Sequence, residues 1–153
     1  MENKEIFDLK GQIAIVTGGG SGLGKEFALA LARAGADVVI ADILLAEAKN
    51  TAREVKAIGQ RALVVKTDVT DPEKVKDMVN RTVNDFLKID ILVNNAGINI
   101  IAPAEEFSFS DWNKIVSINL TGVFLCAQMV GEQMIRQRKG KIINIASIFG
   151  LIG

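Results

Sequence analysis

The sequence contains no tyrosine and no histidine, and it has a single cysteine and two prolines. One cysteine excludes an internal disulfide, which fits a reducing compartment, and we interpret Cys126 as a small buried hydrophobic residue. The 18 basic residues balance the 18 acidic residues, so no excess positive charge is present for binding nucleic acid or an anionic membrane. We therefore expect a cytoplasmic protein that acts on small molecules, and we predict no metal site.

The sequence predicts neither a signal peptide nor a membrane span. Residues 1–5 include acidic side chains and no apolar core, unlike a secretory signal. The longest uncharged stretch lies between Lys114 and Glu132. It is shorter than the roughly 18 apolar residues that indicate a membrane span, and polar residues interrupt it. We expect this stretch to form a helix that is buried inside the protein or at a contact between subunits.

Five short runs rich in valine, isoleucine and leucine predict the fold class. They are continuous rather than alternating, which is typical of strands buried on both faces of a parallel sheet, and helical patterns lie between them. At 153 residues the chain suits one domain. We predict a single α/β domain with a doubly wound, Rossmann-like parallel sheet in the strand order 3-2-1-4-5. The runs are residues 12–17, 37–41, 62–67, 89–94 and 141–146.

Two features of the predicted helices bear on the site. The third helix has two alternative start signals, a capping box of Thr70 with Glu73, or Asp71 as the cap with Pro72 in the first turn. The connection before the fifth strand is much longer than the others and contains a helix from about 110 to 138. We expect this connection to provide substrate contacts, and its helix to form a homo-oligomer, a dimer or a tetramer.

A glycine-rich segment, residues 17–24 with the sequence TGGGSGLG, joins the first strand to the first helix. Glycines let a backbone approach a pyrophosphate closely, and the N–H groups of a helix N-terminus supply the positive potential. The strict G-x-G-x-x-G fingerprint is not met, because Leu23 occupies its last glycine position and the spacing is Gly18-x-x-x-Gly22-x-Gly24. Such glycines can also simply make a tight turn, but the strand, helix and acidic residue around them favour nucleotide binding.

The acidic residue is Asp42, which closes the second predicted strand. A carboxylate here would accept hydrogen bonds from both hydroxyls of an adenosine ribose and would repel a 2′-phosphate. Neither Ser21 nor Ile43 offers a cation to offset that repulsion. The sequence therefore predicts NAD rather than NADP as the cofactor, and the alternative is an ordinary solvated aspartate.

Five motifs span nearly the whole chain: residues 17–24, Asp68 with Val69, residues 94–97, Asn119 and Ser147. In this order they resemble the classical short-chain dehydrogenase/reductase family. The resemblance implies an oxidoreductase that interconverts a secondary alcohol and a ketone with NAD(P).

The resemblance also implies roles for the cofactor-binding residues. The glycine loop would surround the pyrophosphate through Gly18, Gly20, Ser21, Gly22 and Leu23. Asp68 would bond the adenine amino group beside the Val69 backbone, and Asn95, Ala96 and Gly97 would line the adenosine and ribose side. For the asparagines, a loop closed by hydrogen bonds to its own backbone is the alternative.

Two catalytic residues follow from the same resemblance. Asn119 would help to hold a water molecule in a proton relay, and Ser147 would hydrogen-bond the substrate carbonyl or alcohol. Asparagine is unfavourable inside a helix, so we expect something to compensate for Asn119. The alternatives are a helix amide that is merely satisfied and a serine that caps a turn.

The family's proton donor is a tyrosine followed four residues later by a lysine, and this sequence has no tyrosine. We expect a chain that carries the cofactor-binding portion and part of the active site of a longer enzyme. The alternative is a catalytically inactive nucleotide-binding or subunit-association module. Residues 141–146 would form an open, aggregation-prone sheet edge, with further apolar surface from residues 148–153.

Overall fold

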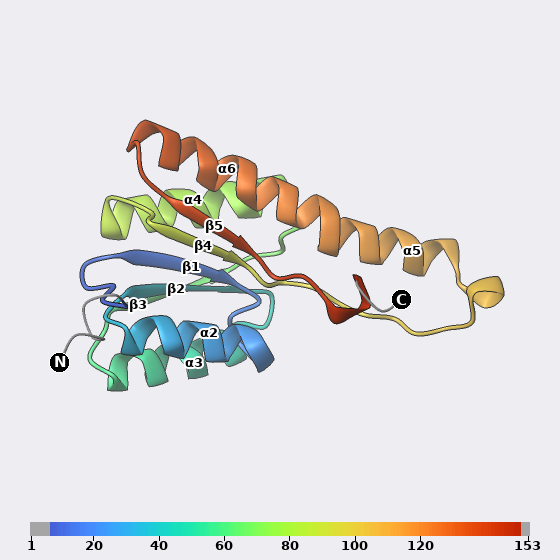
Figure 1. The fold of residues 1–153 in the computed structure, drawn as a ribbon, viewed down its shortest axis with the longest axis horizontal. Helices are drawn as coiled ribbons and strands as arrows, with labels where there is room; N and C mark the ends of the chain where they lie inside the picture. Colours follow the sequence, from blue (N-terminus) through green and yellow to red (C-terminus); the bar gives the residue numbers. More distant parts are fainter. Residues whose placement is uncertain (1–6, 151–153) are drawn as a thin grey trace.

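The computed structural model describes residues 7–150, and its strands form one parallel sheet (Figure 1). The strand order is β3-β2-β1-β4-β5, which confirms the predicted doubly wound fold. Because every strand runs the same way, all the carboxyl ends meet at one edge of the sheet. The strands are β1 Ile13–Thr17, β2 Asp37–Asp42, β3 Ala62–Lys66, β4 Ile91–Asn94 and β5 Lys141–Asn144.

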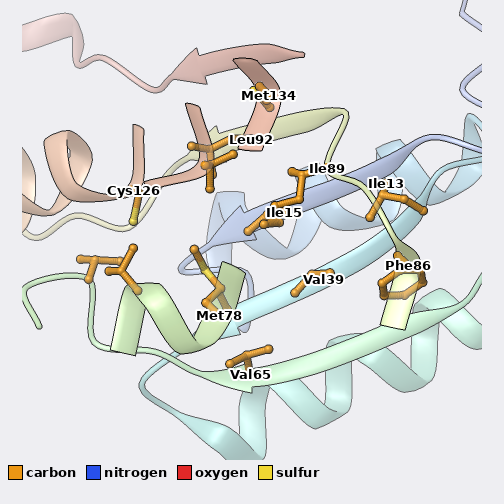
Figure 2. Packing of buried hydrophobic residues seen from close by; sticks show 14 residues of the cluster. Ile13, Ile15, Val39, Val65, Met78, Phe86, Ile89, Leu92, Cys126 and Met134 are labelled. Carbon is orange, nitrogen blue, oxygen red and sulfur yellow. The ribbon is translucent and has the colours of Figure 1, made fainter. Parts of the chain in front are cut away.

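Helices cover both faces of the sheet (Figure 1). Helices α2 (Gly22–Arg33) and α3 (Leu45–Ala57) pack on one face, while α4 (Pro72–Phe86) and α6 (Val123–Arg136) pack on the other. Neighbouring strand residues point to opposite faces, so the continuous apolar runs supply two cores. Figure 2 shows the core beneath α4 and α6, where Ile15, Leu92, Met78 and Cys126 are buried together.

The strand β5 departs from the predicted burial. Its four residues are all exposed, although the composition of residues 141–146 predicted burial on both faces. The reason is position, because β5 pairs with β4 alone and forms the edge of the sheet. The predicted open edge is therefore confirmed, with Ile142, Ile143 and Ile145 partly exposed. Beyond it, η3 (Ile148–Gly150) ends the described chain, and the predicted apolar surface at residues 151–153 lies outside the described residues.

The start of α4 distinguishes between the two predicted caps. The Asp71 carboxylate accepts hydrogen bonds from the backbone N–H groups of Glu73 at 2.9 Å and Lys74 at 3.4 Å, and Pro72 is the first helical residue. The Thr70 hydroxyl instead donates to the Asp68 carboxylate at 2.7 Å. Asp71 is thus the cap, and the capping box at Thr70 was wrong.

The predicted long helix is present and contains a π-helical segment. It runs through α5 (Phe109–Val116), the π-helical η2 (Ser117–Gly122) and α6, after a loop with a short turn, η1 (Ala104–Glu106). This helix, Phe109–Arg136, is long and apolar enough to cross a membrane by length and composition, and 17% of its most apolar window is buried. Most of the helix is therefore exposed in this chain, although Cys126, Val130 and Met134 on its inner face are buried against the sheet. Its exposed large side chains are Phe109, Trp112, Leu120, Phe124 and Ile135.

Candidate functional site

A cleft of 1010 Å³ lies at the carboxyl ends of the strands. It collects side chains from loops that are far apart in the sequence, as expected at the edge where all the carboxyl ends of a doubly wound sheet meet. Among the predicted site residues, all except Gly20 and Gly22 line it. Those that do are Gly18, Ser21, Leu23, Asp42, Asp68, Val69, Asn95, Ala96, Gly97, Asn119 and Ser147.

The glycine loop brings α2 close to the end of β1. Gly18 has a φ of +62°, which favours glycine, and a Cβ on Gly24 would lie 2.1 Å from the Gly18 carbonyl oxygen. Ser21 is the N-cap of α2, yet its side chain makes no capping hydrogen bond and the first turn carries no acidic residue. The N-terminus of α2 is therefore free of an internal anion and suited to an external one.

Asp42 is a buried carboxylate rather than a solvated one, with 8% of its surface exposed. Its Oδ2 accepts a hydrogen bond from the Gly20 backbone N–H at 2.8 Å, and its Oδ1 accepts one from the Leu44 N–H at 2.9 Å. Gly20 thus lies behind Asp42 and outside the cleft lining, and Thr51 donates its hydroxyl to the Gly20 carbonyl at 3.0 Å. The structure gives Gly20 a contact with the carboxylate rather than a place in the cleft.

Gly22 also lies outside the cleft lining, on a neighbouring pocket of 620 Å³ between α2 and α3. The pocket contains Lys25, whose ammonium lies 2.7 Å from the Glu54 carboxylate. The hydrogen bond to Glu54 raises the pKa of Lys25 above its ordinary value. The positive charge nearest to the start of α2 in this pocket is therefore paired within the protein.

The Thr17 hydroxyl connects the end of β1 to the end of β4. It accepts hydrogen bonds from the backbone N–H groups of Asn95 at 3.0 Å and Ala96 at 3.1 Å, and it donates to the Val93 carbonyl at 3.3 Å. The Asn95 side chain donates to the carbonyls of Thr17 at 3.0 Å and Gly18 at 3.3 Å. The loop after β4 is therefore fixed to the glycine loop, and the Asn95 side chain joins the two loops where they line the cleft.

Asn119 lies in the π-helical segment and pairs with the backbone of Ile98. Its Oδ1 accepts from the Ile98 N–H at 2.9 Å, and its Nδ2 donates to the Ile98 carbonyl at 2.8 Å. This double hydrogen bond is the compensation that asparagine in a helix was expected to need. It holds the loop after Gly97 against the long helix, next to the cleft.

The family model for short chain dehydrogenases matches residues 12–153 of the chain. The chain belongs to the short-chain dehydrogenase family. It is 46% identical over 148 residues to short chain dehydrogenase/reductase astE of Aspergillus oryzae, covering 95% of this chain and 57% of that protein. It is 39% identical over 146 residues to a 3-oxoacyl-[acyl-carrier-protein] reductase of Synechocystis, covering 95% and 59%.

Solved structures of the short-chain dehydrogenase family share this fold. A short-chain type dehydrogenase/reductase from Mycobacterium marinum superposes with a TM-score of 0.95 at 37% identity, covering 99% of this chain and 62% of that one. The structure of an NAD⁺-bound xylitol dehydrogenase gives a TM-score of 0.92 at 36% identity, covering 94% and 56%. The chain therefore spans less than two thirds of the length of these relatives.

Two predicted residues of this short-chain dehydrogenase also have local structural contacts. The Asp68 Oδ1 accepts hydrogen bonds from the Thr70 N–H at 2.9 Å and the Thr70 hydroxyl, so it closes a turn after β3. Ser147 lies in the cleft just after β5, and its carbonyl accepts from the Gly150 N–H at 3.0 Å. Both residues keep their predicted positions beside the cleft.

Sequence reasoning missed other residues of the cleft. Lys114 and Asn99 line it, and Thr17 organises it from beneath. Thr17 belongs to the predicted segment 17–24, and it carried a readable signal as a polar residue at the end of an apolar strand, but its role as a hydrogen-bonding residue was not predicted. Lys114 carried none, since a lysine near the start of a helix is ordinarily solvated.

Proposed function

We propose that this chain carries the cofactor-binding portion and part of the active site of a short-chain dehydrogenase that binds NAD(H), in preference to NADP(H), and interconverts a secondary alcohol and a ketone. The observation that carries the cofactor proposal is the position of Asp42 at the cleft wall, with each of its oxygens held by a backbone N–H group. A carboxylate has about four acceptor sites, so two remain for the hydroxyls of a ribose. A 2′-phosphate there would face a buried negative charge.

The remaining cleft fits a dinucleotide in size and chemistry. Its volume of 1010 Å³ lies at the upper end of the roughly 300–1,000 Å³ that is usual for small-molecule and cofactor sites. The N-terminus of α2, beyond Gly18, would hold the pyrophosphate with backbone N–H groups. Asp68 and the Val69 backbone would contact the adenine, and residues 95–97 would line the ribose side.

The bound nicotinamide would supply or accept the hydride, and the chain's own residues would orient the substrate. Ser147 would hydrogen-bond the substrate oxygen from the end of β5, and Asn119, held in place by Ile98, would help to position a water molecule. The relatives that support this reaction class are named as dehydrogenases or reductases of different substrates. They include 2-dehydro-3-deoxy-D-gluconate 5-dehydrogenase of Dickeya dadantii, at 42% identity.

Titration of the purified chain with NADH and NADPH, followed by fluorescence, tests the cofactor proposal. We expect tighter binding of NADH, and we expect Asp42→Ser to reduce the preference by about tenfold or more. Asp85→Asn removes an equal charge from the exposed surface of α4 and should leave the preference unchanged. Tighter binding of NADPH by the unaltered chain would overturn the assignment.

A turnover assay tests whether this chain can complete the reaction without the family's tyrosine. The sequence has no tyrosine to act as the family's proton donor, so we expect negligible alcohol oxidation or ketone reduction by this chain alone. Measurable turnover would mean that another group moves the proton.

We also propose that a second copy packs against the outer face of Phe109–Arg136, giving a dimer or a tetramer. The exposed side chains of Leu120 and Phe124 support this, because large apolar side chains grouped on one helix face usually mark an interface. A protein partner fits better than lipid, since the uncharged part of this helix, between Lys114 and Glu132, is shorter than the ~20 residues of a typical span.

A further inference from the structure

The strand β3 forms the edge of the sheet opposite to β5. The Arg61 carbonyl, just before the strand, and the Thr67 N–H, just after it, both bond to the backbone of β2. Backbone groups of alternate residues point to the same side of a strand, so those of Ala62, Val64 and Lys66 point away from the sheet. Their three N–H groups donate no hydrogen bond within residues 7–150. This edge therefore presents backbone donors to which another strand can pair.

A groove of 610 Å³ lies beside this edge, between α3 and β3. Its floor is apolar, with Ala52 from the helix and Val64 from the strand, and its rim carries Lys49, Arg53 and Lys56. The three basic residues are exposed and recur at a spacing of three and four, so they share one face of α3. No acidic residue lines the groove in the described part of the chain.

The charges on this rim are not neutralised by the protein itself. Among residues 7–150, none of Lys49, Arg53 and Lys56 forms an ion pair. The chain as a whole has equal numbers of acidic and basic residues, so the groove is a local excess of positive charge. Such an excess attracts an acidic partner and repels a basic one.

Two arginines lie at the same edge on its α4 side. The Arg81 guanidinium donates to the Val64 carbonyl at 3.3 Å, in the position that the N–H of a neighbouring strand would take. The Arg61 guanidinium donates to the Asp85 carbonyl at 3.1 Å. Arg81 also lies 3.9 Å from the Asp77 carboxylate, but this pair is exposed and such pairs are weak. An incoming strand can therefore displace Arg81, whose charge then faces that strand.

Cations at a sheet edge often serve only to keep other strands away. That role needs no apolar groove beside the edge. An acidic strand uses all three features, because its backbone pairs with β3, its apolar side chains enter the groove and its carboxylates face the cations. We propose that the β3 edge and the groove between α3 and β3 bind an acidic, extended segment of another protein. No residue of the groove lines the cleft at the carboxyl ends of the strands, so this surface is separate from the proposed coenzyme site.

Fluorescence anisotropy tests the proposal, with the purified chain and a short labelled peptide of alternating glutamate and valine as the probe. We expect binding that weakens as salt is added. Arg53→Glu and Lys56→Glu should each weaken it about fivefold to tenfold, because an attractive charge pair becomes a repulsive one. Lys76→Glu makes the same change at an exposed residue of α4 outside the groove and should leave binding unchanged.

Two further peptides separate strand pairing from general attraction between charges. Replacement of the valines by proline removes backbone N–H groups and should weaken binding at least about fivefold. Replacement of the glutamates by lysine should abolish binding. In nuclear magnetic resonance spectra of the labelled chain, the acidic peptide should shift the amide resonances of Ala62 and Val64 and slow their solvent exchange.

The proposal is overturned if the acidic peptide does not bind, or if the lysine or proline peptide binds as tightly. It is also overturned if Ala62 and Val64 do not respond to the bound peptide. If Arg53→Glu and Lys56→Glu do not fold, the three peptides still decide, because they are compared on the unaltered chain. Aggregation of a variant with all three rim cations neutralised, without peptide binding to the unaltered chain, would assign these residues to edge protection instead.

Discussion

The backbone N–H of Gly20 lies 2.8 Å from Oδ2 of Asp42 and donates a hydrogen bond to it. The glycine loop after β1 and the carboxylate at the end of β2 are therefore one structural unit. Glycine at position 20 allows the Asp42 carboxylate to approach the backbone closely, because a side chain would occupy the space that the Asp42 oxygen and the start of α3 already fill.

Replacement of Gly20 by alanine should disturb coenzyme selection. The new Cβ would lie 2.9 Å from Oδ2 of Asp42 and 3.0 Å from the Ala48 backbone nitrogen. We expect the carboxylate to shift and NADH affinity to fall by about tenfold, with a smaller loss for NADPH. Fluorescence titration of both coenzymes measures this. Gly131→Ala is the control, since a Cβ there meets nothing within 4 Å, and an unchanged preference in Gly20→Ala would contradict the expectation.

Replacement of Thr17 by valine should destabilise the fold. Valine has a similar shape but cannot accept the hydrogen bonds that Asn95 and Ala96 donate at 3.0 and 3.1 Å. Leaving partly buried N–H groups unpaired costs about 1–3 kcal/mol each, so we expect the free energy of unfolding in urea to fall by at least about 1 kcal/mol. Thr17→Ser keeps the hydroxyl and should lose less. Equal losses in the two variants would show that packing, not the hydroxyl, matters.

The thiol of Cys126 should be unreactive in the folded chain. Burial raises the pKa of Cys126 from 9.0 to about 12, so the reactive thiolate is scarce at neutral pH. We expect a disulfide reagent to label Cys126 slowly in buffer and rapidly in urea. Fast labelling of the native chain would contradict its burial.

The same raised pKa predicts a loss of stability at alkaline pH. The unfolded thiol releases its proton near pH 9.0, whereas the folded thiol retains it up to about 12. The unfolded state therefore binds fewer protons across this interval, and stability falls as pH rises from about 9 toward 12. Urea unfolding as a function of pH should show a steeper alkaline decline for the unaltered chain than for Cys126→Ala.

Replacement of Phe124 by glutamate should break the proposed association between copies. Phe124 is 57% exposed on the outer face of α6, and a charge there would be buried in a subunit contact at high cost. We expect a dimer or tetramer of the unaltered chain in analytical ultracentrifugation and a monomer for the variant. Ile101→Glu places the same charge on an exposed loop residue and should preserve the oligomer. If the unaltered chain is a monomer, the proposed association between copies is wrong.

The sequence could predict those features that depend on patterns among residues close together in the chain. The apolar runs of β1 and β2 predicted the sheet, and the glycine loop with Asp42 predicted the place of the cleft. Strand order followed because right-handed crossovers leave few alternatives. For β5 the apolar composition wrongly indicated burial on both faces, although the open edge was predicted correctly, because composition alone cannot show which elements cover a strand.

The remaining features depend on contacts between distant segments. Thr17 meets Asn95 across 78 residues of sequence, and no local pattern marks that pairing. The π-helical segment also lies against a distant part of the chain, since a Cβ on Gly122 would lie 2.7 Å from the Val69 side chain. The pairing of Asn119 with Ile98 was expected only as some unnamed compensation.

The π-helical turn at Ser117–Gly122 has a consequence for insertions and deletions. A wide turn accommodates one residue more than a regular α-helix would in the same length. Removing a single codon from this turn would restore regular α-helical geometry there and leave the helical segments on both sides in nearly their present orientation. The shortened protein would have a more regular helix, and the Asn119 side chain would no longer be aligned with the backbone of Ile98.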